Sequence, residues 1–208
     1  MRIPILLLVL VCSATTAHAL ELEGAGVKAG GAYLTGNVSF EGRDAIDDDT
    51  RIGLVAGAFT EWQLQPDSAF RVILEALYVR KGYEGTRSID AIDDEPVDVK
   101  AGADYLSVPL LGRVLFVDEE LSVYAVFGPS LEFLLSNDDD PLLDEFTSWS
   151  LAGNVGIGLE YPIADPARLL FELRFNTDLT DNFDGDDEQL RINEARYQML
   201  QVTGGIRY

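Results

Sequence analysis

The sequence predicts an all-β fold, an eight-stranded antiparallel up-and-down transmembrane β-barrel. Three observations lead to this prediction. Apolar and polar residues alternate along eight segments, the connections between these segments are alternately short and long, and the chain opens with an export signal. Alternation with period two is typical of strands whose two faces meet different surroundings. Connections of unequal length are typical of membrane barrels, which have short periplasmic turns and longer outer loops.

The N-terminal segment MRIPILLLVLVCSATTAHAL contains one Arg, an apolar core from Ile3 to Val11 and the small-residue site Ala17-His18-Ala19. This arrangement is typical of a secretory signal peptide. We therefore expect residues 1–19 to be a cleaved signal peptide and residues 20–208 to form the barrel domain. Cleavage would remove both the one Cys and the one His of the chain, Cys12 and His18.

The stretch ARLLFELRFN (167–176) shows the strand pattern clearly, because Phe171 and Leu173 fall on one face while Glu172 and Arg174 fall on the other. A tilted strand needs about 9–11 residues to cross a bilayer, and each of the eight segments provides them. The predicted strands cover approximately residues 24–40, 50–63, 68–81, 98–116, 120–136, 146–162, 167–179 and 190–208.

The connections after the second, fourth and sixth predicted strands are short. They cover residues 65–68, 117–120 and 163–167. The other connections are longer and acidic, with clusters at residues 41–49, 89–98, 137–145 and 180–188. An up-and-down barrel places all the short turns at one end and all the long loops at the other. We therefore expect four acidic loops outside the cell.

The alternation alone does not decide which face lies inside. A soluble barrel points apolar residues inward, whereas a membrane barrel has an apolar exterior and a polar lumen. The predicted mature chain has few lysines, and its apolar faces are rich in aromatic residues, which favours the membrane. The polar faces carry Arg71, Arg113, Arg174 and Arg207 together with Glu75, Glu132, Glu160 and Glu172. Inside a narrow barrel these charges would pair across the lumen; on a soluble sheet they would face water.

Two consecutive runs, DYLSVPLLGRVLF (104–116) and VYAVFGPSLEFLL (123–135), resemble the outer-membrane β-barrel domain of PorT-like proteins. In that family a Tyr-Leu-x-x-Pro-Leu-Leu strand precedes a strand with Gly-Pro. GVKAGGAYL (26–34), ILEALYVRKGY (73–83) and LLFELRFNTDLTD (169–181) are similar to its first, third and seventh strands. The resemblance implies an eight-stranded barrel in the outer membrane, a role in protein secretion for some members, and no catalytic residue to carry over.

The last residue, Tyr208, follows Ile206 by two positions and looks like the signal that the barrel-assembly machinery reads. We therefore expect this machinery to be a partner during insertion, and outer-membrane lipid to surround the finished barrel. The net charge of −21 argues against nucleic acid as a partner, because phosphate backbones bind basic surfaces. A further protein partner in the envelope stays open.

The predicted mature chain lacks His and Cys, and the missing His excludes the Ser-His and Asp-His mechanisms of enzymatic barrels. A carboxylate-only hydrolase would need one carboxyl whose pKa is raised by burial, whereas the acidic clusters fall in polar loops. We therefore expect no enzyme activity, no catalytic residue and no cofactor.

The acidic segment DNFDGDDE (181–188) is the candidate metal site, because hard cations such as Ca²⁺ and Mg²⁺ take several oxygen ligands. Its spacing does not fit an EF-hand loop. The candidate ligands are Asp181, Asp184, Asp186 and Asp187. Acidic loops that are simply solvated and keep neighbours apart are the alternative.

These observations predict a non-enzymatic protein of the cell outer membrane, exported through a cleaved signal peptide. Its lumen would be filled by side chains, and its acidic loops would serve surface binding or envelope structure. Two other classes stay open: a barrel component of a protein secretion or assembly system, and a soluble periplasmic ligand-binding β-barrel.

Overall fold

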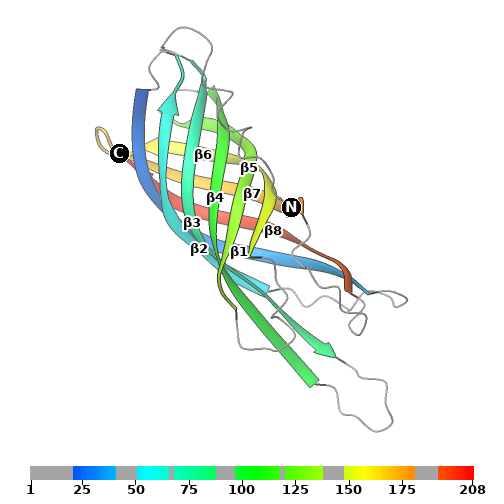
Figure 1. Ribbon diagram of the computed structural model, residues 1–208. Coiled ribbons are helices and arrows are strands. Elements are labelled where there is room, and N and C mark those ends of the chain that lie inside the picture. The colour runs from blue at the N-terminus through cyan, green and yellow to red at the C-terminus, as the bar shows by residue number, and fades with distance from the viewer. Residues whose placement is uncertain are drawn as a thin grey trace, which may run out of the picture.

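The computed structural model describes residues 21–40, 51–65, 68–87, 97–117, 120–137, 148–180 and 192–208. They form a single closed barrel of eight strands in sequential order, so that each strand pairs with its neighbours in the chain and β1 pairs with β8 (Figure 1). The strands are β1 (Glu21–Phe40), β2 (Arg51–Gln63), β3 (Phe70–Arg87), β4 (Val97–Val117), β5 (Ser122–Asn137), β6 (Trp149–Pro162), β7 (Arg168–Asp178) and β8 (Ile192–Arg207).

All pairings are antiparallel, and the seam between β1 and β8 runs from Gly26↔Arg207 to Phe40↔Ile192. The seam continues for one more pair, because the backbone of Ala25 exchanges two hydrogen bonds with that of Tyr208. A closed sheet leaves no strand edge unpaired, which is the condition for placing strands in lipid. The predicted fold class is therefore confirmed.

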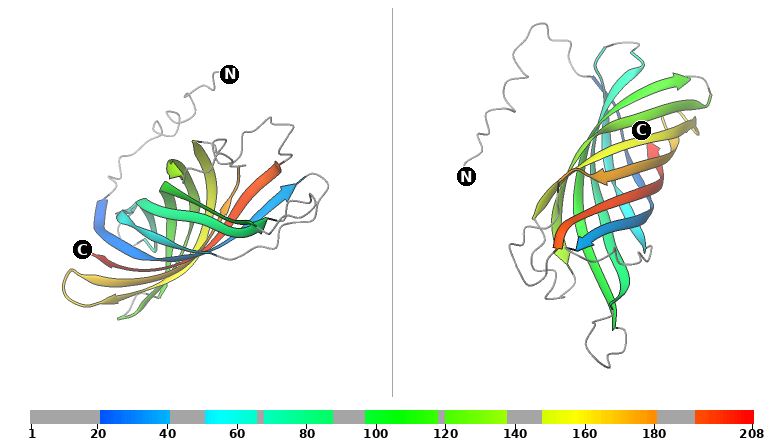
Figure 2. Two further views of the ribbon diagram at one scale, coloured as in Figure 1. Left: turned by 90° about the horizontal axis from the view of Figure 1, so that it is seen from below. Right: turned by 90° about the vertical axis from the view of Figure 1, so that its right-hand side faces the viewer.

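The predicted strand boundaries agree with the structure within a few residues, except at the end of β3. The sequence analysis ended this strand at residue 81, but pairing with β4 continues to Arg87↔Val97. Backbone hydrogen bonds do not depend on side-chain polarity, so a hairpin can extend beyond the region of apolar alternation. The β3–β4 hairpin accordingly projects beyond the neighbouring strands at the long-loop end of the barrel (Figures 1 and 2).

The outward face of the strands is apolar, as predicted for a membrane barrel from the few lysines and the aromatic apolar faces. On β7, the outward Phe171, Leu173 and Phe175 are exposed, while Glu172 and Arg174 between them are buried. The same alternation holds on β6, where Val155, Ile157 and Leu159 point outward. Exposed aromatic side chains at strand ends fit the interfacial girdles of a membrane barrel: Phe116, Trp149, Tyr161 and Tyr208. Other exposed aromatic side chains, such as Phe127 and Phe133 on β5, lie within the strand.

The inward face is more mixed than the sequence analysis expected. Besides charged residues it contains two apolar clusters. The first is Ala32, Leu34, Val55, Leu77, Val79 and Met199, and the second is Phe59, Ile73, Leu111, Tyr124, Val126 and Leu170. An eight-stranded barrel encloses just enough space for its own side chains, so the interior is a packed core rather than a channel lining.

Candidate functional site

The lumen contains three groups of paired charges, stacked from the short-turn end to the long-loop end. The eight Arg and Glu residues predicted to face inward all do so, and each takes part in at least one ion pair. Seven of them are at most 7% exposed, which is rare for charged side chains unless they are paired: Arg113, Arg174, Arg207, Glu75, Glu132, Glu160 and Glu172.

The short-turn cluster comprises Glu23, Glu61, Arg71, Arg113, Glu160, Arg168 and Arg207. Its centre is Arg113 on β4, which donates a 2.7 Å hydrogen bond to Glu61 on β2 and another to Glu160 on β6. Arg113 therefore connects two opposite sides of the lumen. Its guanidinium also lies 3.9 Å from the centroid of the Tyr124 ring, a cation–π contact that offsets part of the desolvation of the charge.

The middle cluster comprises Lys28, Glu75, Glu172 and Arg174. Arg174 on β7 reaches across the lumen to Glu75 on β3 through two hydrogen bonds of 2.7 and 3.0 Å, and it also bonds Glu172 at 2.5 Å. The guanidinium suits this task because its planar fork binds a carboxylate through two bonds at once. Lys28 pairs with the same two carboxylates, at 2.5 Å from Glu75 and 3.2 Å from Glu172.

The long-loop cluster comprises Lys81, Glu132 and Asp178, and it is surrounded by neutral polar groups. Lys81 on β3 pairs with Glu132 on β5 and lies 3.3 Å from Asp178 on β7. Asn176 donates to Glu132 at 3.4 Å and to Asn154 at 3.1 Å. This group is thus held by hydrogen-bonded amides as well as by charge.

The three clusters together balance their charges. They contain seven cations (Lys28, Arg71, Lys81, Arg113, Arg168, Arg174, Arg207) and seven carboxylates (Glu23, Glu61, Glu75, Glu132, Glu160, Glu172, Asp178). The described part of the lumen is therefore formally neutral, in a chain of net charge −21. A neutral, paired interior is what a buried set of ions requires, because an uncompensated buried charge is very costly.

Sequence reasoning missed several lumen residues, above all Glu61, Lys28 and Asp178. Glu61 lies on the same face of β2 as Gly57 and Phe59, so the period-two alternation places it inward. Sequence reasoning overlooked it because Gly and Phe do not mark that face as polar. The carboxylates that sequence reasoning could not pair are now assigned to partners on strands that are distant in the chain.

Gly158 makes room in the lumen for the ring of Tyr124, which contacts two of the clusters. A side chain built on Gly158 would place its Cβ only 2.2 Å from Cζ of Tyr124, so the ring fills the space that glycine leaves open. The Tyr124 hydroxyl donates a 3.3 Å hydrogen bond to Glu172. Tyr124 therefore joins the middle cluster to the short-turn cluster through its hydroxyl and its ring.

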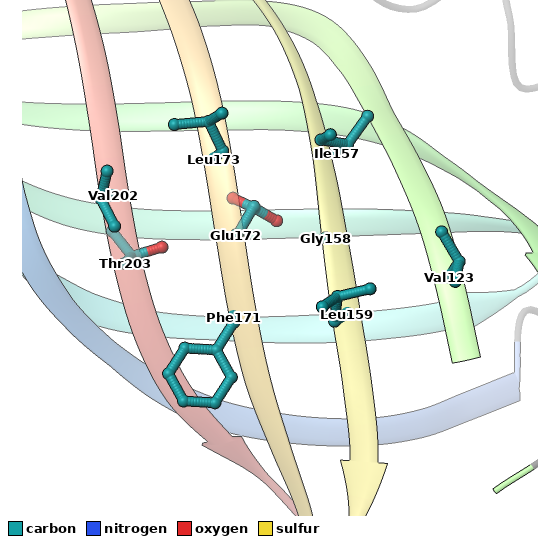
Figure 3. Close-up of a pocket in the computed structure, with 9 residues that line it drawn as sticks. All are labelled: Val123, Ile157, Gly158, Leu159, Phe171, Glu172, Leu173, Val202 and Thr203. Carbon is teal, nitrogen blue, oxygen red and sulfur yellow. The ribbon is translucent and has the colours of Figure 1, made fainter. Parts of the chain in front are cut away.

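The outer wall carries a shallow apolar hollow of about 310 Å³ over β5–β8. Ile157, Leu159, Phe171, Leu173 and Val202 surround Gly158 and Glu172 there (Figure 3). The Glu172 carboxylate is bonded to the lumen cluster, so the hollow presents hydrocarbon to its surroundings. We expect acyl chains of the bilayer to fill it.

Comparison with known families decides what kind of barrel this is. The sequence matches the family described as "Outer membrane protein beta-barrel domain" over residues 5–203. The chain belongs to this family. It is therefore an outer-membrane β-barrel protein, in agreement with the apolar outer wall and the charged lumen. No curated protein matches the sequence.

The solved structure of Neisserial surface protein A agrees with the family on the fold. The barrel is similar to Neisserial surface protein A, with a TM-score of 0.51 and 14% identity over 88% of this chain and 95% of that one. It is also similar to OprG from Pseudomonas aeruginosa, with a TM-score of 0.49 and 14% identity over 90% of this chain and 97% of that one. Identity this low relates the folds alone.

The remaining predicted sites fall outside the part of the chain that the structure describes. Asp181, Asp184, Asp186 and Asp187 lie there, as do the signal peptide at residues 1–19 and most of the acidic loop residues. Within the described ranges, no group of three or more His, Cys, Asp or Glu side chains is arranged to hold a metal ion. No helix among the described residues is long and apolar enough to cross a membrane.

Proposed function

We propose that this outer-membrane barrel is a non-enzymatic protein with a closed lumen that acts through its acidic outer loops, in surface binding or in envelope structure. The observation that carries the proposal is the lumen itself. Side chains bridge it at three levels, through Arg113, Arg174 and Lys81, and all three are at most 2% exposed. A lumen filled in this way leaves the loops as the part of the barrel that reaches other molecules.

The absence of a suitable acid–base pair supports a non-enzymatic role. Every lumen carboxylate named above is ion-paired with an Arg or Lys. General acid–base catalysis needs a group poised to gain or lose a proton near the working pH. Each of these carboxylates holds a cation of the lumen, so the pairs serve structure.

Conductance in planar lipid bilayers tests the closed lumen. We expect the purified barrel to insert without conductance steps, while a general porin in the same bilayer conducts. Steady steps from the wild-type barrel would show an open pathway and contradict the proposal. Heat-dependent mobility on a gel should first show that the inserted protein is folded.

A role in protein secretion is the second candidate, because the runs at residues 104–116 and 123–135 that resemble PorT-like proteins form adjacent strands, β4 and β5. A secretion component needs a protein partner. Crosslinking in intact cells followed by pull-down from solubilised membranes should then recover one defined partner. Recovery of the barrel alone would favour the loop-binding role.

We also propose that the acidic loop at residues 181–188 binds a divalent cation through Asp181, Asp184, Asp186 and Asp187. Calorimetric titration of the folded barrel with Ca²⁺ and with Mg²⁺ measures this directly. Changing the four residues to Asn should abolish the heat of binding, whereas changing Asp138, Asp139 and Asp140 to Asn should leave it unchanged. Equal losses in both variants would indicate a diffuse charge effect.

We also propose that the protein is exported through a cleaved signal peptide and inserted by the barrel-assembly machinery. Cleavage after Ala19 would give a mature chain that begins at Leu20, which the intact mass of the purified protein reports. Recognition by the barrel-assembly machinery would depend on Tyr208. Deleting that residue should lower the amount of folded barrel in the outer membrane, whereas removing the loop acids should not.

A further inference from the structure

One ion pair stands apart from the lumen. Apart from Glu21 at the start of β1, Arg80 on β3 and Asp104 on β4 are the only charged strand side chains at the outward positions that the structure describes. Their direction is clear from their neighbours, because Val79, Lys81 and Tyr105 beside them are all at most 2% exposed. The side chains of Arg80 and Asp104 are 48% and 29% exposed.

The pair lies at the outer rim of the apolar belt. Arg80 follows Phe70, at the short-turn end of β3, by ten residues. A strand that rises about 3.3 Å per residue at a tilt of about 45° climbs roughly 23 Å over ten residues. The apolar band of a membrane barrel is about 25 Å tall, so Arg80 reaches the level where hydrocarbon gives way to lipid headgroups.

The arrangement leaves the guanidinium available. The Tyr78 hydroxyl donates a 2.7 Å hydrogen bond to Oδ1 of Asp104, while Nε of Arg80 lies 3.8 Å from the same oxygen, beyond hydrogen-bond range. Among the described residues Arg80 has no nearer acceptor. Asp104 is thus oriented by Tyr78, and the two charges lie side by side with unused donors and acceptors.

The local backbone supports the same site. The register between β4 and β5 shifts between Asp104 and Tyr105, because Asp104 pairs with Ser136 and Tyr105 with Leu134. The extra residue, Leu135, is 57% exposed, and Leu54 on β2 is 53% exposed. Bulges of this kind often redirect a side chain or interrupt a sheet. The two charges are therefore bordered by apolar side chains on both sides, where lipid must lie.

We propose that Arg80, Asp104 and Tyr78 bind the zwitterionic headgroup of a membrane lipid, a phosphate linked to a primary amine. Arg80 donates to the phosphate oxygens, and Asp104 accepts from the ammonium. Charge complementarity favours this occupant over an anionic lipid, because the pair is neutral overall and belongs to a chain of net charge −21 that repels anions. The lipid-facing position excludes soluble ligands from most of the surface around the site.

Native mass spectrometry of the detergent-purified barrel tests the proposal. The protein is mixed with equal amounts of phosphatidylethanolamine, phosphatidylcholine and phosphatidylglycerol of identical acyl chains. We expect the ethanolamine lipid adduct to exceed each of the others by about fivefold, as one extra charge-assisted pair would give. Ten millimolar inorganic phosphate should not compete, because it lacks the amine and the acyl chains.

Variants separate the roles of the two charges. Arg80→Gln and Asp104→Asn should each reduce the ethanolamine adduct to the level of the choline lipid, while Arg80→Lys should retain part of it. Glu120→Gln, which removes an exposed carboxylate at the short-turn end, is the matched control and should change nothing. All variants should keep the heat-dependent gel mobility of the folded barrel.

Other outcomes would overturn the inference. Equal adducts for all three lipids, or a preference that survives Arg80→Gln, would exclude this site. A stronger glycerol-lipid adduct that grows in Asp104→Asn would indicate a simple anion site instead. The inference needs only insertion of the barrel in a membrane. It can therefore fail while the proposed closed lumen and loop function hold, and it can hold if that proposed function fails.

Discussion

The lumen and the outer wall of this barrel use charge in opposite ways. The described part of the lumen contains seven cations and seven carboxylates in contact with one another, whereas the described outer wall, apart from Glu21 at the start of β1, contains the single pair Arg80–Asp104. Both regions are built by the same strands, whose side chains alternate between them. The comparison shows two ways in which this barrel accommodates a charged side chain. In the lumen the charge has an oppositely charged partner, and on the outer wall it lies at the rim of the apolar belt.

Removing one lumen cation should give the largest effect. Arg174→Ala would leave Glu75 and Glu172 buried with Lys28 as their one remaining cation in the middle cluster. Breaking a buried pair by truncating one partner costs about 3–5 kcal/mol. We expect a loss of this size in urea unfolding in lipid vesicles, followed by gel mobility.

A double variant checks the cause of that loss. In Glu75→Leu with Arg174→Met, the pair formed by Lys28 and Glu172 at 3.2 Å persists, and no charge is left alone. Most of the stability should therefore return. A loss below about 1 kcal/mol for Arg174→Ala alone would show that water reaches the lumen and screens the charges.

Placing a charge in the middle of the outer wall should cost somewhat less. Leu173→Arg introduces a cation into the apolar hollow over β5–β8, where lipid supplies no partner. The expected loss is about 2–4 kcal/mol, measured in the same vesicles. Leu64→Arg, just beyond the short-turn end of β2, is the control and should cost at most about 1 kcal/mol, because charges near the interface are tolerated.

Filling the space that Gly158 leaves for Tyr124 should lower the stability of the barrel less than either charge change. Gly158→Val would collide with Tyr124 inside the lumen, and overpacking of this kind costs about 1–3 kcal/mol. Gly204→Ala is the matched control on the outer wall, since its Cβ would lie 3.7 Å from the Phe171 ring, an ordinary contact. Equal losses in thermal unfolding would contradict the packing that we describe.

Neutralising the outer pair should have the smallest effect on stability. Asp104→Asn removes a partially exposed charge, and such pairs contribute at most about 1 kcal/mol. Unfolding in vesicles should therefore change little, while the preference for the ethanolamine lipid disappears. A destabilisation as large as that of Arg174→Ala would show that Asp104 is a structural residue of the barrel.

Much of the architecture could be read from the sequence, because a strand alternates with an invariant period. Phe171, Leu173 and Phe175 on one side, with Glu172 and Arg174 on the other, define the two faces without any coordinates. The alternating loop lengths then give the order of the strands and the two ends of the barrel. The end of β3 was misplaced, because backbone pairing continues where side-chain alternation stops.

The partners of the charges could not be read in this way. Arg174 and Glu75 are 99 residues apart in the chain, and only the closure of the sheet and the stagger of its strands bring them together. The apolar lumen clusters were hidden for a related reason, since inward Leu77 or Val79 looks like outward Leu74 when strands are read singly.

The sequence by itself determined the eight strands and the two chemically different faces of each, because side-chain alternation is a local property of a strand. Only the tertiary structure decided which carboxylate meets which cation, and that Arg80 and Asp104 stand side by side on the wall. Those contacts depend on register and closure, which are global properties of the folded sheet.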